Sequence, residues 1–230
     1  MEKNKMENPW KDLKQTNGEY IAEYDIECIK NTPALRGALV FNTLPWPYMG
    51  DPERATVYVL AKSTICDDAW GAEERDRQAI KNSLAHSFDG SLPLIALDPR
   101  FDDTSLQIWW LDKLQEVIDK TSLQDVGRYM FVAQYVPYSH HKGKLNKPRK
   151  MLPSQKYTVS LVRGAIKAKK NIVIMSPRPN WYQTIPELET YGKCYTLISP
   201  RSGVISERNV HGEENFRNIV EAINNARGNG

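Results

Sequence analysis

The stretch KNIVIMSPR, residues 170–178, is an apolar run that stops at a proline-containing turn. KCYTLISPR (193–201) does the same, so two apolar runs end in the tripeptide Ser-Pro-Arg. Two further runs, ATVYVLA (55–61) and RYMFVAQYV (128–136), are equally rich in β-branched and aromatic residues. Continuous apolar runs of this length are typical of strands that are covered on both faces. The four runs therefore predict the strands of a buried parallel sheet.

The segments between and after these runs have the three- and four-residue apolar spacing of amphipathic helices. A short helix is expected between the third and fourth strands, and the longer helices are expected over residues 72–88, 106–120, 154–170 and 212–226. Strands that alternate with helices predict an α/β fold, in which ligands bind beyond the carboxyl ends of the parallel strands. We expect a single domain over residues 19–230, preceded by a loose extension over residues 1–18.

The composition is that of an ordinary globular protein, with 40% apolar and 26% charged residues. The three cysteines lie far apart and the histidines lack metal-ligand spacing, so we expect no disulfide, no metal and no cofactor. The sequence has no apolar run of about 18 residues that would predict a membrane span. The polar N-terminal residues also lack the apolar core of a secretory signal. We therefore expect a monomer in the cytoplasm, with reduced cysteines.

The positive charge is concentrated in one part of the chain. Residues 126–186 contain twelve lysines and arginines but no aspartate or glutamate, whereas the net charge of the whole chain is only +3. The remaining residues are therefore net negative. Such asymmetry indicates a polyanionic partner. The alternative interpretation is a solvated loop that is merely basic, centred on HHKGKLNKPRK (140–150).

Several common catalytic motifs are missing from the sequence. It has no GxSxG nucleophile elbow, no GxxxxGK[ST] phosphate loop and no GxGxxG loop. A two-metal nuclease site would need carboxylates at several strand ends, and only Asp67 and Asp68 follow a strand closely. The strands are followed instead by an amide, aromatic rings, proline turns and basic residues. That combination suits a pocket for a nucleobase that has been flipped out of DNA.

Three segments resemble motifs of the uracil-DNA glycosylase superfamily. PYMGDPERATVYVLAKSTICDD (47–68) resembles its first strand and the turn after it, with Lys62 where a catalytic Asn or Asp usually stands. FVAQ (131–134) resembles the strand that ends in a base-reading residue, and SPRSGVIS (199–206) is similar to the second motif. The resemblance covers roughly residues 40–226. It implies a three-layer α/β/α sandwich with a four-stranded parallel sheet.

The resemblance implies candidate catalytic residues at the strand ends. Lys62 is either a cation beside the departing base or an amine that attacks the sugar and forms a Schiff base. It could equally be an ordinary lysine whose stem packs at a strand end. Asp67 or Asp68 would orient the attacking water, although at least one of them could instead cap a helix. Ser199 stands where the second motif usually opens with His or Asn.

The strand ends and the basic segment also offer contacts to the base and to DNA. Gln134 would read the base edge through its amide, and Tyr135 and Tyr138 would stack on the base, unless these side chains belong to the core. Arg201 and Ser202 would donate hydrogen bonds to the base or its phosphates. The expected DNA contacts are an apolar wedge and basic or imidazole side chains, namely Val204, Ile205, His140, His141, Lys142, Lys144, Lys147, Arg149, Lys150, Arg178 and His211.

The expected function is that of a DNA glycosylase, which flips a base out of duplex DNA, excises it and leaves an abasic site. Because the residues that usually form the uracil site are replaced, we expect a different base. A hydroxymethylated or glucosylated cytosine of phage DNA is the leading candidate, and a Schiff base on Lys62 would add lyase activity. Two alternatives stay open: a protein that binds modified or damaged DNA without chemistry, and a hydrolase of small nucleosides.

Overall fold

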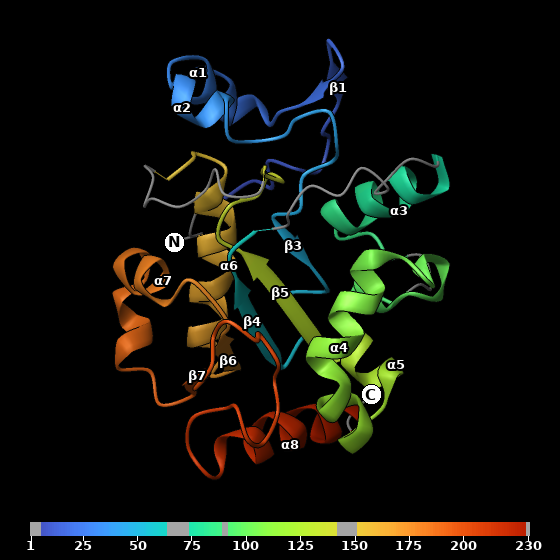
Figure 1. The fold of residues 1–230 in the computed structure, drawn as a ribbon, viewed down its shortest axis with the longest axis vertical. Coiled ribbons are helices and arrows are strands. Elements are labelled where there is room, and N and C mark those ends of the chain that lie inside the picture. The colour runs from blue at the N-terminus through green and yellow to red at the C-terminus, as the bar shows by residue number, and fades with distance from the viewer. Residues whose placement is uncertain (1–5, 64–73, 89–91, 142–150, 229–230) are drawn as a thin grey trace, which may run out of the picture.

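The computed structural model describes residues 6–63, 74–88, 92–141 and 151–228. Its centre is a five-stranded sheet in which four neighbouring strands are parallel. In spatial order the strands are β3 (Tyr48–Met49), β5 (Met130–Gln134), β4 (Val57–Ala61), β6 (Asn171–Ile174) and β7 (Cys194–Thr196) (Figure 1). The four strands expected from the sequence are therefore confirmed, each with slightly shorter bounds.

The fifth strand, β3, corrects the expectation of a four-stranded, all-parallel sheet. It lies at the edge of the sheet and is antiparallel to β5, with Tyr48 opposite Ala133. Gly50 allows this close approach, because a Cβ at that position would lie 2.5 Å from the carbonyl oxygen of Met130. A strand of two residues between prolines and a glycine has no periodicity to detect. Its existence depends on the backbone partner that β5 supplies.

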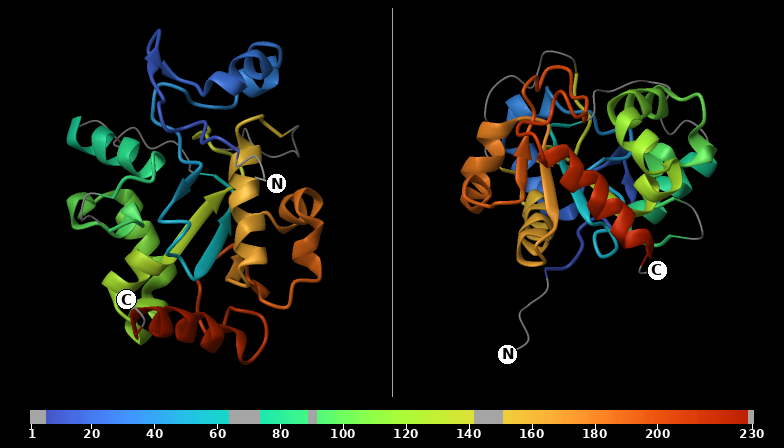
Figure 2. Two further views of the ribbon diagram at one scale, coloured as in Figure 1. Left: turned by 180° about the vertical axis from the view of Figure 1, so that it is seen from behind. Right: turned by 90° about the horizontal axis from the view of Figure 1, so that it is seen from below.

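Helices flank the sheet on both sides (Figures 1 and 2). Two helices lie on one side, namely α6 (Gln155–Lys167) and α7 (Arg178–Thr184). Three lie on the other side, namely α3 (Glu74–Leu84), α4 (Ser105–Lys120) and α5 (Leu123–Tyr129). The last helix, α8 (Asn215–Gly228), crosses the end of the sheet at which the strands begin. The helices expected from the sequence are confirmed where the structure describes them, and α5 takes the first residues of the expected second strand.

The main core lies on both faces of the sheet. Every residue of β5 and β6 is buried, as are four of the five residues of β4. Burial on both faces explains why these strands read as continuous apolar runs rather than as alternating patterns. Within the described residues, none of the helices combines the length and the apolar character that a membrane span requires.

The N-terminal segment packs against the domain. Trp10 is only 1% exposed, and the Asn8 amide donates a hydrogen bond to the carbonyl oxygen of Leu84 over 2.8 Å. A small hairpin and two short helices follow, namely β1 (Gln15–Thr16), β2 (Glu19–Tyr20), α1 (Ile26–Lys30) and α2 (Pro33–Arg36). Within the extension expected over residues 1–18, Trp10 is thus packed into the core, because burying an indole ring removes a large apolar surface from water, whereas residues 14–18 are exposed.

One buried carboxylate ties this segment to two parts of the domain. Asp25 is fully buried and accepts hydrogen bonds from the Tyr138 hydroxyl over 2.8 Å and from the Ser154 amide over 2.9 Å. The Ser154 hydroxyl donates a third bond. Burial raises the pKa of Asp25, and the bonds from Ser154 and Tyr138 oppose that rise. Asp25 thereby fixes the loop after β5 relative to the start of α6.

Candidate functional site

The carboxyl ends of the parallel strands lie together at one edge of the sheet, which is where ligands of α/β proteins bind. The pairing of β4 with β5 continues past the strands, since the Val136 amide donates to the Lys62 carbonyl oxygen over 2.8 Å. On the other side of β4, the Met175 amide donates to the carbonyl oxygen of Leu60 over 2.9 Å. Lys62 therefore stands, half-buried, between the ends of β5 and β6.

A serine and a histidine from neighbouring strand ends are hydrogen bonded beside Lys62. The hydroxyl of Ser63 lies 3.1 Å from Nδ1 of His140. His140 is 5% exposed, and its backbone forms an antiparallel bridge with Leu39 of the N-terminal segment. The expectation that His140 contacts phosphate at the surface is therefore corrected. The structure makes it a fixed polar partner of Ser63, which the sequence could not reveal because 77 positions separate the two residues.

Tyr138 does not have the position expected of a base-stacking residue. Its ring is 1% exposed and packs edge-on against Trp10 and Phe41. Its hydroxyl is bonded to Asp25, and burial raises the pKa of Tyr138 well above its ordinary value. The stacking role is therefore wrong, because the ring is part of the core that holds the N-terminal segment.

Two more of the expected base-binding residues, Gln134 and Tyr135, lie at the end of β5. Gln134 closes β5, as expected, with a side chain that is 4% exposed. Tyr135 is half-buried, and its hydroxyl lies 3.0 Å from that of Thr184 in α7. Its ring also packs edge-on against Trp181, with 5.2 Å between the ring centroids. The Tyr135 ring is thus held against α7, while its backbone amide donates to the carbonyl oxygen of Ala61, the neighbour of Lys62, over 2.9 Å.

The segment after β7 forms an exposed turn that Asn209 holds in shape. We call Ser199–Ser206 the second turn, because it begins with the second of the two Ser-Pro-Arg tripeptides. The side-chain oxygen of Asn209 accepts from the Ser199 amide over 2.8 Å, and its nitrogen donates to the Val204 carbonyl over 2.6 Å. The same nitrogen donates to the Ser202 hydroxyl over 3.1 Å. This role could not be predicted from the sequence, because it depends on contacts across a loop.

The side chains of the second turn differ in their accessibility. Ser199, Arg201 and Ser202 are exposed and Val204 is half-buried, so these four can reach a ligand. Ile205 is fully buried, and its amide donates to the Lys113 carbonyl oxygen of α4 over 2.9 Å. The expected role of Ile205 as a wedge in DNA is therefore corrected, because its side chain anchors the turn to the core.

In β7, which leads into the second turn, Tyr195 is buried, and Cys194 and Thr196 are half-buried. Burial raises the pKa of the Cys194 thiol to about 12. At the far side of the turn, Gly203 adopts a positive φ of 67° and lies against Met175, whose methyl carbon would be 3.0 Å from a Cβ at that position. The turn is thereby brought to the end of β6. His211, which follows the turn, is exposed.

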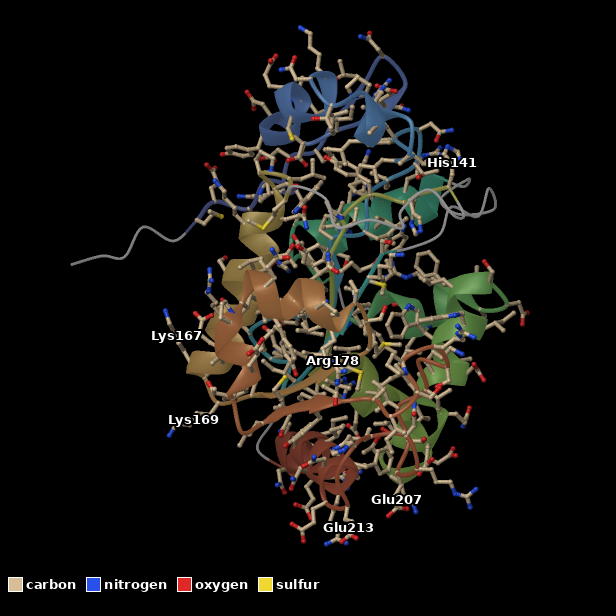
Figure 3. All side chains as sticks on the ribbon, turned by 60° about the vertical axis from the view of Figure 1, so that its left-hand side comes forward. His141, Lys167, Lys169, Arg178, Glu207 and Glu213 are labelled. Atoms are coloured by element: carbon tan, nitrogen blue, oxygen red, sulfur yellow. The ribbon has the colours of Figure 1, made fainter. Side chains whose placement is uncertain are left out.

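The basic segment does not form a single face in the described part of the chain. Figure 3 shows Arg178 near the middle of the molecule and His141 nearer the N-terminal segment, whereas Lys167 and Lys169 point away at another side. Lys170 is held at the beginning of β6, where its ammonium donates to the carbonyl oxygens of Pro52 and Glu53 over 2.8 and 2.9 Å. Basic residues of one sequence segment therefore lie apart in space, because α6 carries Lys167 and Lys169 away from His141.

Several predicted site residues lie outside the described residues. They are Asp67, Asp68, Lys142, Lys144, Lys147, Arg149 and Lys150. Among the residues that the structure describes, no three histidine, cysteine, aspartate or glutamate side chains gather as a metal site. A search of protein-family models, of curated proteins and of solved structures finds no match to this chain.

Proposed function

We propose that this protein is a DNA N-glycosylase with the three-layer α/β/α sandwich of the uracil-DNA glycosylase superfamily. One observation carries the proposal: Lys62 and the hydrogen-bonded pair Ser63–His140 stand together at the carboxyl ends of β4 and β5. The exposed donors of the second turn approach the same edge from β7. This is a fixed polar surface at the ligand end of a parallel sheet, with donors arriving from separate elements.

The chemistry of base excision fits these groups. Cleavage of an N-glycosidic bond leaves positive charge on the sugar and negative charge on the departing base. The ammonium of Lys62 would stabilise the departing base, or its neutral amine would attack the sugar carbon and form a Schiff base. Ser63 would donate a hydrogen bond to the bound nucleotide, and His140 would hold the hydroxyl in position. Arg201 and Ser202 would bind the base or its phosphates.

The proposed target is a hydroxymethylated or glucosylated cytosine in phage DNA. The usual residues of the uracil site are replaced by Lys62 and Ser199, which favours a base other than uracil. Gln134 closes β5 and would suit the donor and acceptor edge of a cytosine if its amide is exposed on binding. The substrate class rests on the replaced motif residues, and the reaction class rests on the Lys62 and Ser63–His140 group.

The decisive experiment measures abasic sites in three DNA substrates: unmodified, uracil-containing and phage-modified with hydroxymethylated or glucosylated cytosine. We expect abasic sites in the modified DNA alone. Ser63→Ala should lower the rate about 100-fold, the lower end of what proton-transfer and positioning groups contribute. Lys167→Ala is the matched control, since that exposed lysine points away from the site. An enzyme that leaves all three DNAs intact would contradict the proposal.

Lys62→Arg separates the two roles of Lys62. An arginine retains the positive charge but cannot form a Schiff base, so activity is retained if Lys62 acts as a cation and lost if it acts as a nucleophile. Borohydride trapping of the wild type gives the independent readout, because it links the protein covalently to DNA only in the second case.

A binding protein without chemistry is the second candidate. It is favoured by one observation: Lys62 stands where the resembled first motif usually has a catalytic Asn or Asp. This candidate predicts tight binding of modified DNA by the wild type with no abasic sites. A hydrolase of small nucleosides is distinguished by salt, because its rate would not fall steeply with ionic strength as DNA binding does.

A further inference from the structure

An exposed tryptophan on α4 lies beside the second turn. Trp109 is 44% exposed, whereas the adjacent Trp110 is 2% exposed and packs into the core. Ile108, the residue before it, is 59% exposed. An exposed indole offers a large flat apolar face with a polar N–H, and for this reason tryptophan is enriched at binding interfaces. Both tryptophans lie in the helix expected over residues 106–120, and only Trp110 packs into the core.

Trp109 is joined to the second turn through Lys113. The ammonium of Lys113 lies 5.4 Å from the centroid of the Trp109 ring. The backbone carbonyl of Lys113 accepts the amide of Ile205, and its side chain would lie 3.7 Å from a Cβ at Gly203. Figure 1 shows the segment after β7 running across to α4. Lys113 therefore links the indole ring of Trp109 to the second turn.

We propose that Trp109 is a stacking platform for an unpaired nucleobase of DNA bound at the second turn. The idea rests on the proposed function for its ligand class, but it concerns binding rather than base excision. With Ile205 buried, the second turn keeps two accessible apolar side chains, the exposed Pro200 and the half-buried Val204, and neither has an aromatic ring. Trp109 supplies the flat apolar surface next to it, and every base has a face that can stack on an indole.

The charges around Trp109 favour stacking over phosphate binding as its contribution. Lys113 is paired with Asp112, and its side chain is 14% exposed, so little of its charge is available to a phosphate. Glu116, one turn further along α4, accepts the Glu207 amide over 3.1 Å. The exposed cationic donor in the second turn is Arg201. A nucleotide there would place its phosphate towards Arg201 and its base on Trp109.

The test is the affinity of Trp109→Ala for a single-stranded oligonucleotide and for a duplex with one unpaired base, each measured at several salt concentrations. We expect both affinities to fall about 5- to 100-fold, which is the range for losing one base–aromatic stack. The loss should be the same at every salt concentration, because stacking releases no counterions. Trp109→Phe should recover part of the affinity, and Ile108→Ala, the matched exposed apolar control, should leave it unchanged.

The outcomes separate this inference from the proposed function when abasic sites are measured in parallel. If the wild type excises a base and Trp109→Ala binds both DNAs as tightly as the wild type, the platform is overturned and the glycosylase stands. If the wild type excises nothing but Trp109→Ala loses DNA affinity, the platform stands and the glycosylase fails. A loss that Ile108→Ala reproduces equally, or a wild type that binds neither DNA, overturns the platform.

Discussion

After β6, the tripeptide Ser176-Pro177-Arg178 leads directly into α7; after β7, Ser199-Pro200-Arg201 leads into an exposed turn. Both tripeptides follow parallel strands that are neighbours in the sheet. In the first, Pro177 caps α7 and its carbonyl oxygen accepts the amide of Trp181, whose ring is 1% exposed. In the second, all three side chains are exposed.

The two segments differ in what holds the Ser-Pro-Arg tripeptide itself. Trp181 holds the first by burial, with its indole nitrogen donating to the Ala61 carbonyl oxygen over 3.3 Å. Asn209 holds the second by hydrogen bonds to the backbone of the turn. A segment that is held by burial cannot present the buried group to a ligand. The hydrogen bonds from Asn209 to the backbone leave the side chains of Ser199, Arg201 and Ser202 exposed. The second turn is therefore the better candidate for binding.

The largest effect should come from Trp181→Ala. It removes a buried indole that supports the first segment, and we expect the free energy of unfolding to fall by about 3–5 kcal/mol. Urea denaturation measures the change. Trp109→Ala is the matched control and should change stability by less than about 0.5 kcal/mol, because that ring is exposed. Equal losses in the two variants would mean that burial does not distinguish the segments.

The next effect concerns Cys194 in β7, the strand that leads into the second turn. Because burial raises the pKa of Cys194 to about 12, its thiol stays protonated at pH 8, and the thiolate is the reactive form. In a Cys28→Ser, Cys66→Ser background, we expect the folded protein to react with a thiol reagent at least about 100-fold more slowly than the urea-unfolded protein. The rate should keep rising with pH above 9.0, the ordinary pKa of a cysteine, because the thiolate fraction grows until the pH reaches about 12. Similar rates for both states at pH 8 would contradict the burial of this thiol.

Asn209→Ala tests the polar brace itself. It removes the hydrogen bonds to Ser199 and Val204, so we expect a loss of about 1–2 kcal/mol in the free energy of unfolding and a clear loss of DNA affinity. Asn209→Asp should be intermediate, because it keeps the acceptor for Ser199 but loses the donor to Val204. Unfolding and DNA titration measure the two effects. An unchanged affinity would remove the second turn from the binding site.

The smallest effect is expected from Arg201→Ala. If Arg201 contacts one phosphate, the slope of log affinity against log salt should become about 0.9 less steep for duplex DNA. Arg163→Ala is the matched control, because its guanidinium is already bonded to Glu187 over 3.3 Å and to the Thr184 carbonyl over 3.2 Å. Identical slopes for the wild type and Arg201→Ala would show that the exposed turn makes no phosphate contact.

Some parts of the site could be read from the sequence and others could not. The strand ends at Lys62 and Gln134 followed from where the apolar runs stop. The pairing of Ser63 with His140 could not be foreseen, since it joins residues that are distant in the chain. Nor could the burial of Tyr138, which depends on Asp25 reaching the loop from the N-terminal segment. Spacing along a chain reports which face of an element is apolar, but not what covers that face.

The sequence by itself determined the four parallel strands, the main helices between them and the edge of the sheet at which a ligand would bind. These features follow from local periodicity and from the placement of turn residues, which act over a few positions. Only the tertiary structure decided that β3 completes the sheet, that Ile205 is an anchor and that Trp109 is exposed. It also gave the two identical tripeptides different roles. The physical reason is that burial and hydrogen-bond partners come from segments far away in the chain, so the same residues take their function from what packs against them.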